Sequence, residues 1–221
     1  MAHLEELPLF PLHTVLFPYA PIQLHIFEER YREMVRNCLD FDLPFGVVLI
    51  RSGSEIGPGA ETYMVGTAAR IENIHHYDDG RMDIMVRGQN RFRVRKFDTS
   101  KPYMVGMVEP VVELEPENED RVFALATRAQ ESFRLWIESA FSRPDMNVHV
   151  QFPTDSSQVS FLIANLLPAE NLVKQQLLET TDTAQRLTDL IPLIERQIIE
   201  ARSQALYKLD ARHMTDWINP N

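Results

Sequence analysis

The stretch LPLFPLHTVLFPYAPIQLHIFEERYREMVRNCL, residues 7–39, decides the fold, because three kinds of local structure follow one another in it. Its first half is apolar and interrupted by prolines, and Pro18 and Pro21 bracket a predicted turn. Alternation of apolar and polar residues then predicts a half-buried strand over residues 22–26. From Phe27 onward the apolar residues recur at helical spacing, with charged residues on the opposite face. A strand, a turn, a second strand and a helix in this order form the nucleus of a small β-rich domain.

The segment that follows is rich in predicted strands. Apolar runs and alternating patterns predict strands at residues 45–50, 63–74, 81–87, 91–97 and 103–114. Asp79 and Gly80 predict a tight hairpin turn, because both residue types tolerate positive φ. A second turn is expected at residues 88–91. One helix with about six or seven strands is typical of a small closed or semi-closed barrel.

The sequence pattern changes after Leu114. Residues 115–118 include two glutamates and Pro116, lie in an acidic stretch from Glu113 to Asp120 and show no apolar periodicity, which is typical of a linker. Helical spacing beyond them predicts helices at residues 120–141, 155–166, 169–179 and 182–205, the second opened by a capping aspartate at position 155. The chain is therefore predicted to be an α+β protein, with a β-barrel over residues 1–114 and a helical bundle over residues 119–212.

Three segments, in order along the chain, carry a family resemblance. The first is LPLFPL followed by VLFP and IFEERYREMV. The second is VGTAARIENI, then DG, then MDIMVRGQNRFRV. The third is FLIANLLPAENLVKQQLLETTDTAQRLTDLIPLIERQI. Together they resemble the N-terminal substrate-recognition domain of Lon proteases, which also occurs as a free-standing protein. The resemblance implies a PUA-like β-barrel followed by an α-helical bundle.

The resemblance also implies a function. Full Lon proteases continue into an ATPase module and a Ser/Lys protease module, whereas this chain ends at Asn221 without a phosphate loop. We therefore expect a free-standing protein that is not an enzyme and that recognises unfolded or client proteins through exposed peptide segments. It would serve a protease or a chaperone as an adaptor.

The proline-aromatic loop is the expected contact surface for such segments. Phe17, Pro18, Tyr19 and Pro21 would offer aromatic and apolar side chains that select little by sequence. The alternative is that Phe17 and Tyr19 only cover one end of the barrel, as buried aromatics often do.

A basic stripe supports a competing hypothesis of RNA binding, because PUA-like folds can bind RNA. Arg87, Arg91, Arg93 and Arg95 recur along predicted strands, with Phe92 between them. The net charge of −10 instead favours the solvent face of an amphipathic strand and argues against nucleic acid as a partner.

No metal or cofactor is expected. His75 and His76 with Asp78 and Asp79 resemble a metal site, but adjacent strand residues point to opposite faces and no further His or Cys cluster completes the ligand set. The glycine-rich loop at residues 52–59 lacks the lysine of a phosphate cradle, and no G-x-S-x-G elbow occurs. A small-molecule hydrolase or ligand-binding protein is a third class, which a deep polar pocket would favour.

Composition indicates the compartment. Cys38 is the only cysteine and lies on the apolar face of the first helix, so we expect a buried packing role and no intrachain disulfide. The N-terminus has no basic signal region and no apolar run reaches the length of a membrane span, so the cytoplasm is the expected location. Leu206, Tyr207 and Leu209 extend the apolar content of the last helix and offer a surface for a homo-oligomer.

Overall fold

The computed structural model describes the backbone of residues 4–56, 59–98, 100–141 and 150–218, and the side chains of these residues up to 203. The chain divides into two compact units: residues 1–115 with 169–182, and residues 116–168 with 183–221. The described residues form six strands followed for the most part by helices, five in all, which confirms the predicted α+β class. Among the described residues, none of the helices combines the length and the apolar character needed to cross a bilayer.

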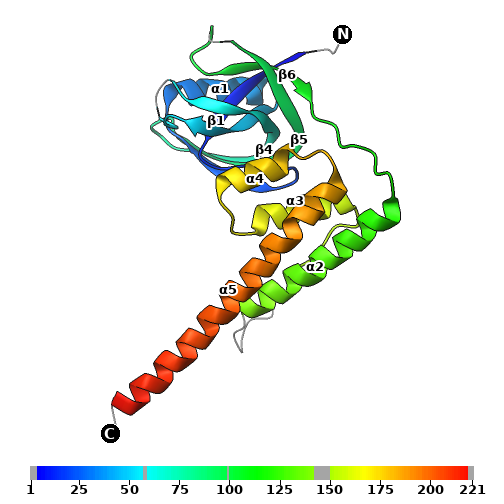
Figure 1. The fold of residues 1–221 in the computed structure, drawn as a ribbon. Coiled ribbons are helices and arrows are strands. Elements are labelled where there is room, and N and C mark those ends of the chain that lie inside the picture. The colour runs from blue at the N-terminus through cyan, green and yellow to red at the C-terminus, as the bar shows by residue number, and fades with distance from the viewer. Residues whose placement is uncertain (1–3, 57–58, 99, 142–149, 219–221) are drawn as a thin grey trace. The chain divides into compact units, whose positions relative to one another are not determined.

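The first unit is built on one mixed sheet (Figure 1). Its strands are β1 (Glu5–Leu12), β2 (Pro21–Ile26), β3 (Phe45–Ser52), β4 (Glu61–His76), β5 (Met82–Asp98) and β6 (Val105–Pro110). They pair in the order β2-β5-β4-β3-β1-β6, and β6 also pairs with β5. The additional pairing closes β5, β4, β3, β1 and β6 into a ring and leaves β2 attached outside it, on β5. Only β1 and β3 run parallel; the other pairs are antiparallel.

The longest strand corrects one of the predicted turns. The turn at Asp79 and Gly80 is confirmed, since Gly80 has a φ of 84° and its N–H donates to the Tyr77 carbonyl. The turn at residues 88–91 is wrong, because β5 continues through them. Gly88 is a typical turn residue, but it pairs opposite Ala69 of β4, and only a shift in register separates this pair from Arg91 opposite Thr67. Pairing with neighbouring strands satisfies the backbone there, so local propensity does not decide the structure.

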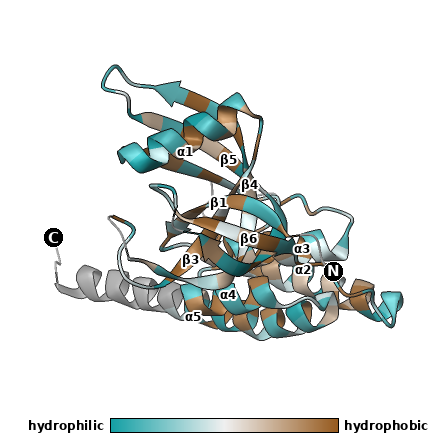
Figure 2. Cartoon of the chain, turned by 90° about the horizontal axis from the view of Figure 1, so that it is seen from above, coloured by the Kyte–Doolittle hydropathy of each residue, from teal (hydrophilic) through white to brown (hydrophobic). Residues whose placement is uncertain are grey.

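One hydrophobic core cluster of this unit joins buried residues of β1, β3, β5 and β6, and α1 (Glu29–Asp40) also buries one of its faces. Hydrophobic and hydrophilic residues are mixed along the strands (Figure 2). β2 and much of β5 alternate between buried and more exposed positions, whereas β3 is buried at each of residues 45–50. The helix contributes its predicted apolar face. The buried helix residues are Tyr31, Met34, Val35 and Cys38.

Cys38 is expected to be an unreactive thiol in the native protein. Burial raises the pKa of its thiol to about 11, and its side chain is 3% exposed. Because only the thiolate attacks disulfide reagents, labelling by DTNB at pH 8 should be about 100-fold slower than for a free cysteine, from the pKa alone. The same assay in urea should restore the rate, and fast labelling of the folded protein would contradict the buried role.

The helix α4 (Asn171–Glu179) belongs to the barrel unit, although its sequence placed it within the predicted helical bundle. Leu177 and Leu178 are buried, and the Gln175 side chain donates to the Val65 carbonyl of β4 at 3.0 Å. At the other end of the helix, the Asn171 amide donates to the His13 carbonyl at 2.5 Å. A nine-residue apolar pattern does not reveal which neighbouring surface will cover it, so periodicity did not predict this placement.

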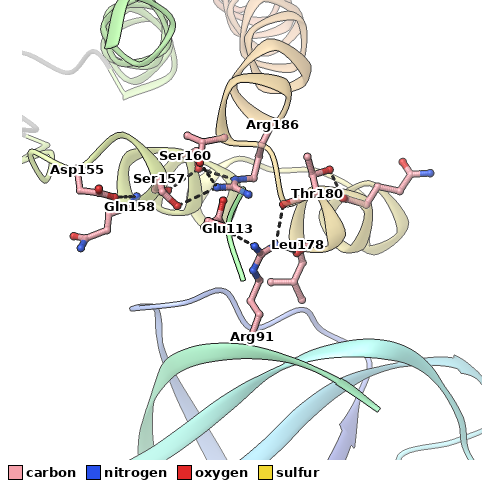
Figure 3. A network of polar contacts seen from close by, with 11 residues as sticks. Arg91, Glu113, Asp155, Ser157, Gln158, Ser160, Leu178, Thr180 and Arg186 are labelled. Carbon is pink, nitrogen blue, oxygen red and sulfur yellow. Dashed lines mark hydrogen bonds and ion pairs between the residues drawn. The ribbon is translucent and has the colours of Figure 1, made fainter. Parts of the chain in front are cut away.

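The second unit contains α2 (Glu119–Phe141), α3 (Ser156–Leu166) and α5 (Thr183–Ile218). The predicted cap of α3 is confirmed, since the Asp155 carboxylate accepts the Gln158 N–H at 2.8 Å. Arg186 of α5 is fully buried; its guanidinium donates to the hydroxyls of Ser157, Ser160 and Thr183 at 2.7–3.1 Å (Figure 3). Its guanidinium also lies 4.0 Å above the Phe161 ring. These contacts make Arg186 a structural residue that joins α3 to α5.

The surface predicted for a homo-oligomer falls on Leu206, Tyr207 and Leu209. The side chains of these residues lie outside the described part of the chain.

Candidate functional site

The predicted contact loop forms a tight turn between β1 and β2. The Ala20 N–H donates to the Phe17 carbonyl at 3.2 Å, which makes residues 17–20 a β-turn. Pro18 occupies the second position and Tyr19 the third, with a φ of 66°. Proline followed by a residue of positive φ is the arrangement of a type II turn, in which the third position usually holds glycine.

The turn separates the four predicted contact residues into two groups. The Phe17 side chain is 0% exposed, and Pro18 is buried beside it. Tyr19 is 53% exposed, and Pro21, the first residue of β2, is also exposed. Phe17 therefore anchors the turn in the core, as the alternative interpretation of this residue expected. Tyr19 and Pro21 are the side chains that remain open to a ligand.

Backbone contacts with β5 hold the turn in place. The Tyr19 N–H donates to the Gly88 carbonyl at 2.9 Å, and the Gly88 N–H donates to the Ala20 carbonyl at 2.9 Å. The Arg87 guanidinium donates to the Tyr19 carbonyl at 3.0 Å. From β4, the buried Thr67 hydroxyl donates to the Leu16 carbonyl at 2.6 Å. These hydrogen bonds thus fix the backbone of the turn that carries the exposed Tyr19 side chain.

A glycine at position 88 is required for this contact. A Cβ added there would lie 2.2 Å from the Phe17 carbonyl oxygen, a backbone atom that no side-chain adjustment can move. Sequence reasoning missed Gly88 and Thr67 as supports of the loop. The available signal was a glycine inside a long alternating strand, which often marks a close approach of another backbone.

Tyr19 itself is held in an unusual conformation. A bulky residue at positive φ costs about 1–2 kcal/mol relative to glycine. Such strain persists only when surrounding contacts enforce it, and it is more frequent at functional sites than elsewhere. The chemistry that this arrangement offers is contact by an aromatic ring and a proline, without a nucleophile or a general base.

The four arginines of the basic stripe do not form one open cationic surface. Arg91 is 3% exposed, and its guanidinium donates to the carbonyls of Leu178 and Thr180 and pairs with Glu113 (Figure 3). It therefore fastens the segment after α4 to the barrel.

Arg87 and Arg95, which flank Arg91 on β5, pair with carboxylates as well. Arg87 makes a two-pronged contact with Glu72, with its nearest atom at 2.5 Å, and this carboxylate raises the pKa of Arg87. Arg95 pairs with Glu109. Arg93 is half-buried. Three of the four arginines of the stripe, Arg87, Arg91 and Arg95, are thus paired with carboxylates of the same unit.

The residues that resembled a metal site point to separate partners. The His75 ring packs edge-on against Tyr77, with ring centroids 4.8 Å apart. Asp79 binds Arg81 at 2.7 Å, and hydrogen bonds from the Arg81 backbone and side chain lower the pKa of Asp79. Within the described part of the chain, no three His, Cys, Asp or Glu side chains gather as a metal site would require.

Comparison with known proteins identifies the family. A model of the substrate-binding domain of ATP-dependent protease La (Lon) matches residues 6–196, which is most of the chain. This protein belongs to the Lon substrate-binding domain family. The resemblance seen in three sequence segments is therefore confirmed.

Individual relatives agree with the family assignment. A Lon protease of Desulfovibrio desulfuricans is 28% identical over 215 residues, which cover 96% of this chain and 24% of that protein. A Lon protease 2 of Herpetosiphon aurantiacus is 28% identical over 196 residues, with coverage of 87% and 24%. The chain thus spans about a quarter of the length of the curated Lon proteases it matches.

Solved structures show the same Lon-type fold. A Lon N-terminal domain protein from Xanthomonas campestris is 31% identical, with a TM-score of 0.57 and coverage of 85% of this chain and 98% of that one. The N-terminal domain of a Mycobacterium avium complex Lon protease has a TM-score of 0.66 at 19% identity, with coverage of 86% and 98%. The second similarity concerns the fold alone.

Proposed function

We propose that this Lon substrate-binding domain recognises exposed apolar segments of unfolded proteins, and that the turn at Tyr19 and Pro21 is part of its contact surface. One observation carries the proposal: Tyr19 is 53% exposed although its backbone is held at a φ of 66°. Family membership supports a role in substrate recognition.

The physical argument rests on a preorganised aromatic side chain. Tyrosine offers a large contact area that only a few side-chain torsions must order, so little conformational entropy is lost on binding. Its backbone is already held by Gly88 and Arg87, and therefore the loop has little left to order. Contact of this kind depends on apolar area more than on sequence, which suits the capture of many different unfolded chains.

The mechanism requires no bond making. The chain would bind a client by apolar contact and hold it for a protease or a chaperone, acting as an adaptor in the cytoplasm. Family membership and the contact chemistry of the turn support a non-catalytic role for this chain. Its partner protease or chaperone is part of the proposal.

Replacement of Tyr19 by glycine tests the proposal without damaging the fold. Glycine adopts positive φ freely, so the free energy of unfolding should stay the same or rise by up to about 1 kcal/mol. Affinity for reduced, carboxymethylated α-lactalbumin, measured by fluorescence anisotropy, should fall about tenfold, the effect of losing one good aromatic contact.

Phe41→Ala is the matched control. Phe41 is an aromatic residue of the same unit that is 72% exposed and lies outside the turn. We expect its replacement to leave the affinity within about twofold of the original protein. Equal losses for both variants would indicate unspecific adhesion, and an unchanged affinity for Tyr19→Gly would remove the turn from the binding surface.

A further inference from the structure

The strand β2 leads directly from the Tyr19 turn and lies at an edge of the sheet. Among the described residues, its one strand neighbour is β5, with Pro21 opposite Arg87 and Ile26 opposite Met82. An edge strand presents unpaired N–H and C=O groups on its free side. Proteins usually protect such an edge, and an unprotected one is able to accept a further strand.

The register shows which backbone groups of β2 are free. Extending it by one position places Ala20 opposite Gly88, and the Gly88 N–H donates to the Ala20 carbonyl. In an antiparallel pair, every second residue bonds to the neighbouring strand. The backbone N–H and C=O groups of Ile22, Leu24 and Ile26 therefore point toward β5. The N–H and C=O groups of Gln23 and His25 point away from β5, and both residues are exposed.

A cavity lies beside this free edge. It has a volume of about 210 Å³ and is lined by β2 residues from Gln23 to Ile26, by β1, by α1 and by the loop after β3. Part of its lining is the ring of Phe10, packed 4.1 Å from the ring of Tyr31. At its margin, Phe27 is 46% exposed and Ile56 is 65% exposed. The cavity thus offers apolar surface directly beside the free edge of β2, where a side chain of a bound segment could enter it.

The charged lining of the cavity is acidic. Its carboxylate residues are Glu28 and Glu55. Arg30, beside the cavity, pairs with Glu28 at 3.1 Å and donates to the Glu55 backbone carbonyl at 3.2 Å, so one guanidinium faces two carboxylates and the Glu55 carboxylate is left to attract a cation. Both carboxylates also help to keep the nearby Tyr31 neutral, although burial is the largest cause of the raised pKa of that phenol, about 12. A ligand that carries positive charge next to an apolar group complements this lining.

We propose that the free edge of β2 binds an extended polypeptide segment as an added strand, with an apolar side chain in the adjoining cavity and a Lys or Arg near Glu55. The inference rests on the proposed function and states how the client is held. Donors and acceptors on a strand edge repeat about every 7 Å, a spacing that another extended backbone matches. Recognition through the backbone also tolerates many client sequences.

The test uses a short synthetic peptide with a Lys-Val-Phe-Ile-Val-Lys core and compares two substitutions at one position. Gln23→Pro removes the outward N–H of the edge, where proline is tolerated, and leaves the bonds of Ile22 and Leu24 to β5 intact. Gln23→Thr keeps the N–H. We expect proline to weaken peptide binding about tenfold, and threonine to leave it within about twofold.

Two further measurements locate the bound segment. On binding of the peptide, amide hydrogen exchange should slow at Gln23 and His25. N-methylation of alternate peptide amides should abolish binding in one of the two registers, because it removes the donors that pair with the edge. Exchange of Lys for Glu in the peptide should weaken binding, and added salt should reduce the difference.

The outcomes separate this inference from the proposed function. If the original protein binds neither the peptide nor unfolded α-lactalbumin, both fail. Strand addition is overturned, while the proposed function stands, if the original protein binds both ligands and Tyr19→Gly weakens this binding, but neither Gln23→Pro nor N-methylation of the peptide does. If exchange at Gln23 slows with protein concentration in the absence of peptide, a second copy occupies the edge and the inference is overturned. If Gln23→Pro also lowers the hydrogen-exchange protection of the Leu24 amide, β2 itself is disturbed in this variant. Binding of the N-methylated peptides then decides whether a strand is added.

Discussion

Replacement of Arg91 by alanine is expected to lower the free energy of unfolding of the barrel unit by about 3–5 kcal/mol. The guanidinium is buried, donates to the carbonyls of Leu178 and Thr180, and pairs with Glu113. Its removal leaves two carbonyl oxygens and a carboxylate without this donor, which costs more than the net strength of the bonds themselves. Urea denaturation followed by circular dichroism measures the change.

Arg95→Ala is the control, because Arg95 lies on the same strand and also pairs with a carboxylate. Its side chain is 52% exposed, so water replaces the lost contact with Glu109 and the stability should change little. Amide hydrogen exchange in α4 measures the local effect. Its rate should rise sharply for Arg91→Ala and stay unchanged for Arg95→Ala. Similar effects of the two substitutions would contradict a structural role for Arg91.

Gly88→Ala is expected to destabilise the protein by about 3 kcal/mol and to abolish most binding of unfolded protein. The new methyl group would meet the Phe17 carbonyl oxygen at 2.2 Å, so the turn must move away from β5. That movement breaks the two backbone bonds that position Tyr19 and Ala20. Denaturation and the anisotropy assay report the two effects separately.

Gly106→Ala provides the comparison for this substitution. The three atoms nearest to a Cβ there belong to side chains, that of Leu9 at 3.0 Å and those of Val108 and Val94 at 3.2 and 3.3 Å. These methyl groups can shift by a few tenths of an ångström, so we expect a loss of about 1 kcal/mol and unchanged binding. If both glycine variants behaved alike, the close approach at Gly88 would not be what supports the turn.

Much of the fold was predictable because its signals are local. The apolar face of α1, the hairpin at Gly80 and the Asp155 cap each depend on residues within a few positions of one another. The turn expected at residues 88–91 failed for the opposite reason. Its composition is that of a turn, but pairing with strands distant in sequence keeps the segment extended.

The candidate site was predictable only in outline. Proline, aromatic residues and a strand start marked the loop, yet nothing local distinguishes Phe17, which is buried, from Tyr19, which is exposed. Likewise, four arginines at alternating positions suggest one cationic face. Residues elsewhere in the chain bury Arg91 and supply the carboxylates that pair with Arg87 and Arg95.

The sequence by itself determined the α+β class, most element positions and the family, because periodicity, capping and motif order depend on residues that are close to one another in the chain. Tertiary structure alone decided that α4 joins the barrel, that Gly88 contacts the turn, and that β2, among the described strands, pairs with β5 alone. Each of these depends on which surfaces meet after folding, and a strand or helix pattern shows that a face will be covered without showing what covers it. In residues 7–39, the pattern therefore located the turn, and only the folded chain showed that Tyr19 is its open side chain.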